Sequence, residues 1–181
     1  MYGLVNKAIR DLVTSEFGEE RWHEVADAAG VEHTFIGMDS YDDDVTYRLV
    51  GAASEKLGID AEEVLRQFGS YWIRFTATEG YGPLVEALGD TLPEFLTNLG
   101  NDLHARVALT MPDLKPPEFS TEEVAENHFR VHYLSHRVGL KPMVQGLLEG
   151  LAERYEATAE VSHIETIGDS PIHEVFEVRI L

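Results

Sequence analysis

The stretch NHFRVHYLS, residues 127–135, marks the point where the sequence changes from helical to extended periodicity. Successive side chains of a strand point to opposite faces of a sheet, so every second residue shares a face. One face takes Phe129, Val131, Tyr133 and Ser135. The other face takes His128, Arg130, His132 and Leu134. The alternation predicts a strand that turns its first face toward a core.

The chain before this strand has the apolar spacing of amphipathic helices, in which apolar residues recur every three or four positions. The segments with this spacing are 1–18, 19–30, 45–58, 62–75 and 91–109. The double proline at 116–117 cannot continue a helix, because proline lacks the backbone N–H and its ring clashes with the preceding turn. Most of the first two-thirds of the chain is therefore predicted to be helical.

Short polar signals predict where these helices begin and end. Gly30 is predicted to cap the C-terminal end of the second helix. Asp60 and Glu63 have the spacing of a capping box at the start of the fourth helix. The acidic run DSYDDD, residues 39–44, lacks the glycine and glutamate of an EF-hand loop, so we interpret it as a helix cap rather than a calcium site.

The segments after residue 135 complete the fold class. A helical segment at 141–155 is followed by two alternating segments, 156–168 and 173–181, which DSP at 169–171 joins as a hairpin. The order helices, strand, helix, hairpin is typical of the α+β class with an antiparallel sheet. A chain of 181 residues that is 44% hydrophobic is expected to form one domain with a real core.

Composition excludes several function classes. The absence of cysteine removes disulfides, thiolate catalysis, cysteine zinc sites and iron–sulfur clusters. A formal net charge of −19 disfavours binding to nucleic acid and to anionic membranes. The sequence contains no apolar run of roughly 20 residues and does not begin like a signal peptide, so we expect a cytoplasmic protein.

Common catalytic motifs are absent as well. His128 and His132 have a zinc-like spacing only if they are helical, and the glutamate of H-E-x-x-H is missing, so we interpret them as solvated strand residues. The sequence contains no G-x-S-x-G, P-loop or G-x-G-x-x-G. These absences favour a protein that is not an enzyme.

The segment YLSHR, residues 133–137, is different. In an extended chain Tyr133, Ser135 and Arg137 share one side. Two hydroxyls and a guanidinium make a site for carboxylates, since arginine pairs with them through two parallel hydrogen bonds. The alternative is an arginine bonded to a nearby Asp or Glu of the protein, with Tyr133 and Ser135 incidental.

A lone histidine in a helix-like run, His104, together with the Pro-Pro pair and YLSHR, supplies the parts needed to hold a haem and its two propionates. With them the sequence resembles the H-NOX haem domains, the gas-sensing module also found in soluble guanylate cyclase. The resemblance covers the whole chain. The segments that carry it are MYGLVN (1–6), YDDDVTYRLVGAASEKLG (41–58), FGSYW (68–72), LPEFLTNLGNDLHARV (92–107), KPPEF (115–119), YLSHR (133–137) and GLLEGL (146–151).

The resemblance implies a haem b, iron protoporphyrin IX, buried between a helical N-terminal subdomain, 1–65, and a haem-anchoring subdomain with the sheet, 66–181. His104 matches the proximal ligand, the single protein bond to the iron. Tyr133, Ser135 and Arg137 match the propionate clamp. Pro117 matches the proline that presses on the porphyrin, and Pro116 is its neighbour.

The other side of the haem departs from some members of the family. Oxygen-binding members carry a distal tyrosine, whereas the corresponding segment here, VGLKPMVQG at 138–146, has Met143 and no tyrosine. Trp72 and Val5 also match distal positions. The resemblance therefore implies a five-coordinate ferrous haem that binds NO and CO and largely excludes O₂.

The resemblance further implies a sensor that signals to a separate effector, commonly a histidine kinase or a diguanylate cyclase, when the bond from iron to His104 weakens and the haem relaxes. Two other functions stay open at this point. One is a haem enzyme that turns over NO, O₂ or peroxide, against which a distal pocket without an acid–base residue argues. The other is a haem-free helical adaptor.

Overall fold

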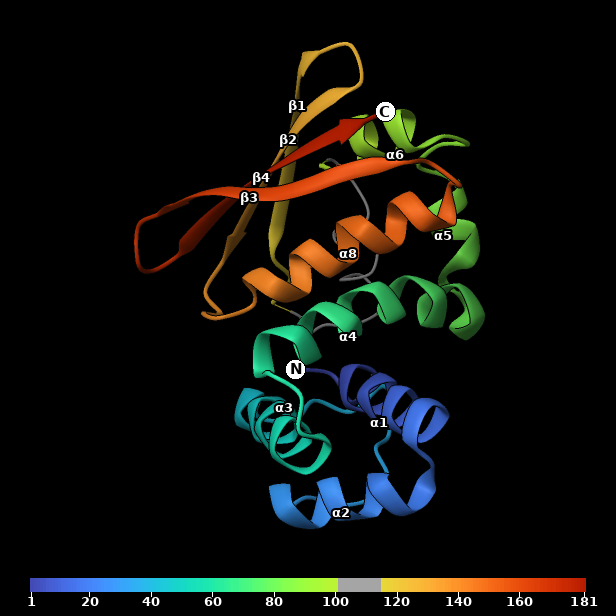
Figure 1. Ribbon diagram of the computed structural model, residues 1–181, viewed down its shortest axis with the longest axis vertical. Helices are drawn as coiled ribbons and strands as arrows, with labels where there is room; N and C mark the ends of the chain where they lie inside the picture. Colours follow the sequence, from blue (N-terminus) through green and yellow to red (C-terminus); the bar gives the residue numbers. More distant parts are fainter. Residues whose placement is uncertain (101–114) are drawn as a thin grey trace.

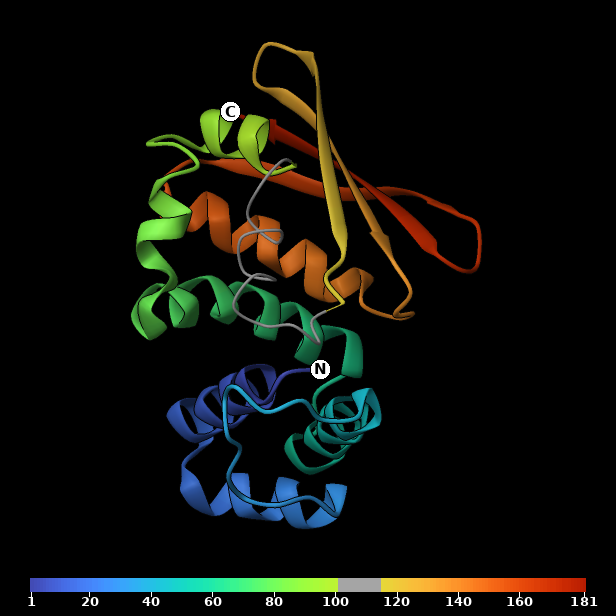
Figure 2. The same ribbon diagram turned by 180° about the vertical axis from the view of Figure 1, so that it is seen from behind.

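Helices α4 and α8 form the middle of the molecule and separate three N-terminal helices from an antiparallel sheet (Figures 1 and 2). The computed structural model describes residues 1–100 and 115–181. The helical elements are α1 (Gly3–Phe17), α2 (Glu19–Ala29), α3 (Asp43–Leu57), α4 (Ala61–Thr76), the π-helical turn η1 (Ala77–Tyr81), α5 (Gly82–Glu86), α6 (Leu92–Asn98) and α8 (Lys141–Arg154). The strands are β1 (Glu118–Ala125), β2 (His128–Ser135), β3 (Ala159–Ile167) and β4 (Ile172–Ile180). The predicted α+β class is confirmed.

Local capping chemistry sets the boundaries of α2 and α3. The Asp42 side chain accepts a hydrogen bond from the Asp44 N–H at 3.0 Å, so the acidic run caps a helix, as predicted. Gly30 follows α2 and Gly58 follows α3, with φ of +63° and +67°. Glycine adopts this left-handed conformation without steric cost, which confirms the predicted cap at Gly30.

The predicted capping box at the start of α4 is wrong in one of its two halves. Asp60 does accept a hydrogen bond within the first turn, from the Glu62 N–H at 2.9 Å. Glu63 instead accepts hydrogen bonds from the side chains of Arg66 and Gln67. A guanidinium one turn away forms a charge-assisted bond, which is stronger than a bond from a neutral backbone N–H.

The sheet has the strand order β1-β2-β4-β3, and all its pairs are antiparallel. Every second residue of β2 is buried, which confirms the alternation predicted for this strand; the buried residues are Phe129, Val131, Tyr133 and Ser135. The predicted hairpin is also present as β3 and β4. Strand β1 is an addition to the predicted order, so the sequence runs helices, hairpin, helix, hairpin. Its mostly exposed residues, EFSTEEVA, carry little apolar alternation, as expected for a strand at the edge of a sheet.

The helix predicted over 91–109 is interrupted within the described residues. Helix α6 ends at Asn98, and Leu99 and Gly100 form a turn. An added Cβ at Gly100 would lie 3.1 Å from the Phe119 carbonyl oxygen, so the chain here passes close to the backbone of β1. The rest of the predicted helix lies outside the described residues.

Two hydrophobic clusters make up the core, and α4 contributes to both. Phe68 and Phe75 pack among the buried residues of α1, α2 and α3. Ile73 packs on the second cluster, which joins α5, α6, α8 and the inner face of the sheet. The predicted subdomain boundary at residue 65 therefore falls inside a shared helix, and the division itself stays a prediction. None of the helices in the described ranges is both long enough and apolar enough to cross a bilayer.

Glycines allow α4 and α8 to touch backbone to backbone. A Cβ added at Gly69 would collide with the Met143 carbonyl oxygen, and one added at Gly146 would collide with the Arg66 carbonyl oxygen. A Cβ at Gly150 would lie 2.8 Å from the Ser70 Cα. In each case the obstacle is backbone, which cannot move aside as a side chain can. The spacing of α4 and α8 is therefore fixed by the absence of these side chains.

Gly146→Ala should lower the free energy of unfolding by about 1–3 kcal/mol, because the added methyl overpacks this contact. Gly51→Ala is the matched control, since Gly51 lies inside α3 with nothing within 4 Å of an added Cβ. The control should raise the stability by roughly 0.5–1 kcal/mol through helix propensity. Urea denaturation of both variants checks the pair, and equal effects would contradict the packing argument.

Candidate functional site

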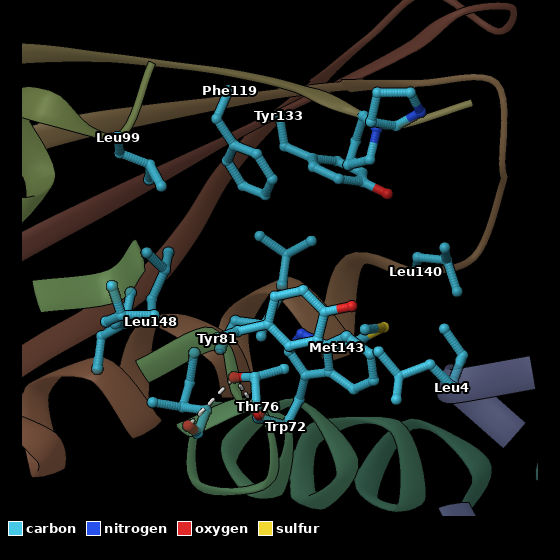
Figure 3. A pocket seen from close by; sticks show the side chains of 18 of the residues that line it. Leu4, Trp72, Thr76, Tyr81, Leu99, Phe119, Tyr133, Leu140, Met143 and Leu148 are labelled. Atoms are coloured by element: carbon cyan, nitrogen blue, oxygen red, sulfur yellow. Dashed lines mark hydrogen bonds between the residues drawn. The ribbon is translucent and has the colours of Figure 1, made fainter. Parts of the chain in front are cut away.

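A cavity of ≈ 270 Å³ lies between the α4 and α8 helices and the inner face of the sheet (Figure 3). A water molecule needs roughly 10–15 Å³ measured in this way, so the space suits an organic group rather than a few waters. Its walls come from α1, α4, α5, α6, α8, β1, β2 and the segments beside them. The predicted site residues that line it are Val5, Trp72, Pro116, Pro117, Tyr133, Arg137 and Met143.

The sheet side of the cavity carries the YLSHR segment. Tyr133 is 4% exposed, lies on the cavity wall, and packs its ring 5.2 Å from that of Phe119. Burial raises the pKa of the Tyr133 hydroxyl, and a hydrogen bond with Ser135 and the charge of Arg137 offset part of that rise. Ser135 is buried beside the wall, where its hydroxyl oxygen accepts a hydrogen bond from the Arg137 N–H at 3.1 Å. The three residues thus form one connected group.

Arg137 already binds a carboxylate of the protein. Its Nε donates to Asp43 Oδ2 at 2.8 Å, its Nη2 to Asp43 Oδ1 at 3.5 Å, and its Nη1 to the Lys115 carbonyl oxygen at 2.8 Å. The alternative weighed for this arginine, a bond to a nearby Asp, is therefore present. A guanidinium has five N–H donors, so two remain after the bonds to residues in the described ranges. Arg137 also lines the cavity, so the bond to Asp43 is compatible with the predicted carboxylate site, which stays a prediction.

Asp43 joins two positive groups at the edge of the cavity. The N-terminal ammonium of Met1 donates to Asp43 Oδ1 at 2.5 Å, beside the bond from Arg137. Desolvation raises the pKa of the Asp43 carboxyl, but the hydrogen bonds and charges of the ammonium and of Arg137 outweigh it, so the pKa lies below its ordinary value. This bridge connects the first turn of α3 with the end of β2.

The opposite wall of the cavity is mostly apolar. Trp72 of α4, Met143 of α8 and Leu4 of α1 lie there (Figure 3), and the next residue of α1, Val5, also lines the cavity. The Trp72 ring packs 5.9 Å from that of Phe68, which fixes its place in the helix layer. Its indole N–H has no hydrogen-bond partner among residues 1–100 and 115–181. This wall offers a bound molecule mainly hydrocarbon, with the Trp72 indole N–H as a donor.

The structure adds two residues that the sequence did not point to: Asp43, which binds Arg137 beside the cavity, and Tyr81, which lines it. Asp43 was one of four aspartates in an acidic run, and nothing local set it apart, because its partner Arg137 lies 94 residues away. Tyr81 lines the cavity from the turn after α4. The Glu-Gly-Tyr sequence of that turn could have signalled a helix break, since Gly80 adopts a φ of +93°. His104 lies outside the described residues.

The residues present fit a haem. The cavity pairs apolar walls with one cationic edge at Arg137 and Lys115, as a flat apolar ring system with carboxylates along one side requires. The free N–H groups of Arg137 and the Tyr133 and Ser135 hydroxyls are donors suited to those carboxylates. In the described part of the chain, no group of three or more His, Asp or Glu side chains could hold a bare metal ion.

Comparison with known proteins decides the family. The family described as Haem-NO-binding matches residues 2–163. The chain belongs to the Haem-NO-binding family. It is a haem-binding domain of the gas-sensor type, related to soluble guanylate cyclase.

The relatives agree with this membership, and solved structures share the fold. Soluble guanylate cyclase gcy-35 of Caenorhabditis elegans is 30% identical over 91% of this chain, and gcy-31 is 30% identical over 89%. The chain spans only 24% and 23% of the length of these relatives. An H-NOX protein from S. oneidensis in the Fe(II)NO state superposes with a TM-score of 0.87 at 18% identity, with 100% and 99% of the two chains covered. An oxygen-binding H-NOX domain superposes with a TM-score of 0.84 at 21% identity, with 99% and 95% covered.

Asp43→Asn should destabilise this domain at neutral pH, and the difference from the native chain should shrink in acid. The lowered pKa of Asp43 means that its ionised form is favoured by folding. That stabilisation is full above the ordinary carboxyl pKa of 3.8 and disappears as the pH falls through the lowered folded value. Denaturation midpoints measured between neutral pH and acid check this sign.

Asp39→Asn is the control for that experiment, because Asp39 is an exposed aspartate of the same acidic run. Asp39→Asn should change the denaturation midpoint little at any pH. A difference for Asp43→Asn that grew as the pH fell would contradict the assigned bridge.

Proposed function

We propose that this domain holds a haem b and senses NO and CO while excluding O₂. The observation that carries the proposal is the cavity itself, with Arg137 and Tyr133 on one wall and a mostly apolar wall opposite. Ferrous haem would supply an iron with an open axial position for a diatomic gas. His104, the histidine that matches the proximal ligand of the family, would hold that iron.

Three side chains at the end of β2 would hold the propionates. Tyr133 and Arg137 reach the cavity wall, and Ser135 lies directly behind them. Arg137 keeps two N–H donors after its bonds to Asp43 and Lys115, so a propionate adds to the existing bridge and need not break it. Asp43 would then orient the guanidinium in the way a carboxylate orients a ligand from behind.

The two prolines at the start of β1 would complete the ring of contacts around the haem. Pro116 and Pro117 line the cavity between Lys115 and β1. Proline has a fixed φ and no rotatable side chain, so it forms a stiff wall. Pro117 would press on the porphyrin, with Pro116 beside it.

Gas selectivity would come from the apolar wall. In haem proteins, donors and polarity on the distal side decide whether O₂ binds. Met143 lies in the segment that corresponds to the one with the distal tyrosine in oxygen-binding members, and its thioether donates no hydrogen bond. Val5 and Leu4 add only hydrocarbon. O₂ would therefore gain little from these three side chains, whereas NO and CO need no donor.

The signal would pass between the two halves of the molecule and then to another protein. The Arg137–Asp43 bridge connects the haem-anchoring strand to α3, so movement at the clamp would reach the N-terminal helices. The effector would be a histidine kinase or a diguanylate cyclase, as is common in the family. The net charge of −19 suits a basic or neutral partner surface and a cytoplasmic location away from nucleic acid and lipid.

Optical spectra of the reduced protein test the proposal. The spectrum under vacuum should be that of a five-coordinate ferrous haem, should change with CO and with NO, and should stay unchanged when air is admitted briefly. Arg137→Met should bind haem more weakly, by roughly tenfold or more, because a charged hydrogen bond contributes about 1.5–3 kcal/mol. Lys56→Met, which removes a surface charge, should bind haem normally.

A stable oxygenated spectrum in air would contradict the assigned gas selectivity. Steady consumption of NO or peroxide would show an enzyme instead. A colourless protein that takes up no haemin would overturn the proposal as a whole.

A further inference from the structure

Tyr81 lies where the cavity wall meets an exposed stretch of chain. Its side chain lines the cavity, and its ring lies on the same side as Trp72 and Met143, across from Tyr133 (Figure 3). The three residues before it, at 78–80, are exposed. A small movement of this turn would therefore change the cavity wall without disturbing the core.

The turn that carries Tyr81 is a break in the helix. Glu79 has φ −83° and ψ 17°, and Gly80 has φ +93° and ψ 2°, so both depart from helical geometry. Glycine takes such a positive φ without the clash that a side chain would bring. The Tyr81 hydroxyl makes no hydrogen bond to any residue in the described ranges. Its position is therefore set by the backbone of the turn rather than by a bond of its own.

An ion pair attaches this turn to α1. Lys7 Nζ lies 2.5 Å from Glu79 Oε2, although the residues are 72 positions apart. The Lys7 ammonium also lies 5.5 Å from the centroid of the Phe75 ring, which holds it over the end of α4. Helix α1 carries Leu4 and Val5 on the cavity wall. The pair thus joins the helix that forms one part of the wall to the turn that forms the next.

We propose that the Lys7–Glu79 pair is a latch that holds the Tyr81 turn against the cavity and so sets how fast diatomic gases pass in and out. The proposal rests on the gas binding proposed above. Lys7 and Glu79 are positioning residues, because they act through Tyr81 and lie outside the cavity lining. Their side chains are 26% and 32% exposed, so water and salt weaken the pair. A weak ion pair is suited to this role, because the turn would have to open each time a gas molecule passes.

A latch of this kind has a specific kinetic signature. A latch that holds the turn equally in the gas-free and the gas-bound protein changes both rates alike, so opening the turn more often would speed entry and exit by the same factor. The equilibrium affinity stays unchanged, because the latch has no differential interaction with the free and bound states. A side chain that touched the bound gas would instead change one rate more than the other.

Glu79→Gln and Lys7→Met in the haem-loaded protein test the latch, with CO as the probe. Flash photolysis gives the association rate, and replacement of CO by NO gives the dissociation rate. Both rates should rise by roughly 2- to 5-fold, the range that an exposed ion pair allows, and their ratio should stay constant. Added salt should speed the native protein and leave Glu79→Gln unaffected.

Matched variants separate the latch from a general charge effect. Glu24→Gln removes a charge of the same kind from the Arg21–Glu24 pair on α2, and its CO rates should equal those of the native protein. The double exchange Lys7→Glu with Glu79→Lys should bring the rates back toward native values. Tyr81→Ala should speed both rates at least as much as Glu79→Gln.

The mobility of the turn can also be measured directly, without bound gas or haem. Amide hydrogen exchange at residues 77–82 should become faster in Glu79→Gln and stay native in Glu24→Gln, in both the haem-free and the haem-loaded protein. Unchanged exchange or unchanged CO rates in Glu79→Gln would overturn the latch. A changed CO affinity or C–O stretching frequency would overturn it too. CO binding by the native protein tests the proposed function alone, whereas the ratio of variant to native rates tests the latch.

Discussion

The backbone contact between α4 and α8 is the constraint on which the rest of the molecule depends. Gly69 and Gly146 let the two helices approach until main chain meets main chain. That approach places Trp72 of one helix and Met143 of the other on the same wall of the cavity. It also leaves the sheet on the far side of α8, so that the cavity forms between a helical layer and a sheet layer (Figures 1 and 2).

The polar edge of the cavity depends on a second long-range contact. Arg137 at the end of β2 binds Asp43 at the start of α3, and this bridge crosses from the sheet to the N-terminal helices. A guanidinium fixed from behind presents its remaining N–H groups in one direction, which favours an anionic group at that edge. The same contact offers a physical route by which a change in the cavity would reach α3. Haem binding and signalling would therefore both depend on the Arg137 side chain.

Much of this arrangement could be predicted from local patterns, and the exceptions have physical causes. The alternation around Tyr133 predicted the strand and its buried face, and the apolar spacing predicted α1, α2, α3, α4, α6 and α8 but not α5. Strand β1 was not predicted, because an edge strand needs little apolar surface and so shows little apolar alternation. Asp43 and Tyr81 were not predicted, because their places at the site depend on contacts with residues far away in the sequence. His104, the residue on which the iron would depend, lies outside the described residues, so its role stays a prediction.

The most direct test is a crystal structure of the reduced, haem-loaded protein. It should show the iron bonded to one protein atom, a ring nitrogen of His104, and both propionates near Tyr133, Ser135 and Arg137, with the Arg137–Asp43 bridge intact. The position facing Met143 should hold no protein ligand. A second protein bond to the iron, or propionates that point toward Tyr81 instead, would contradict the account.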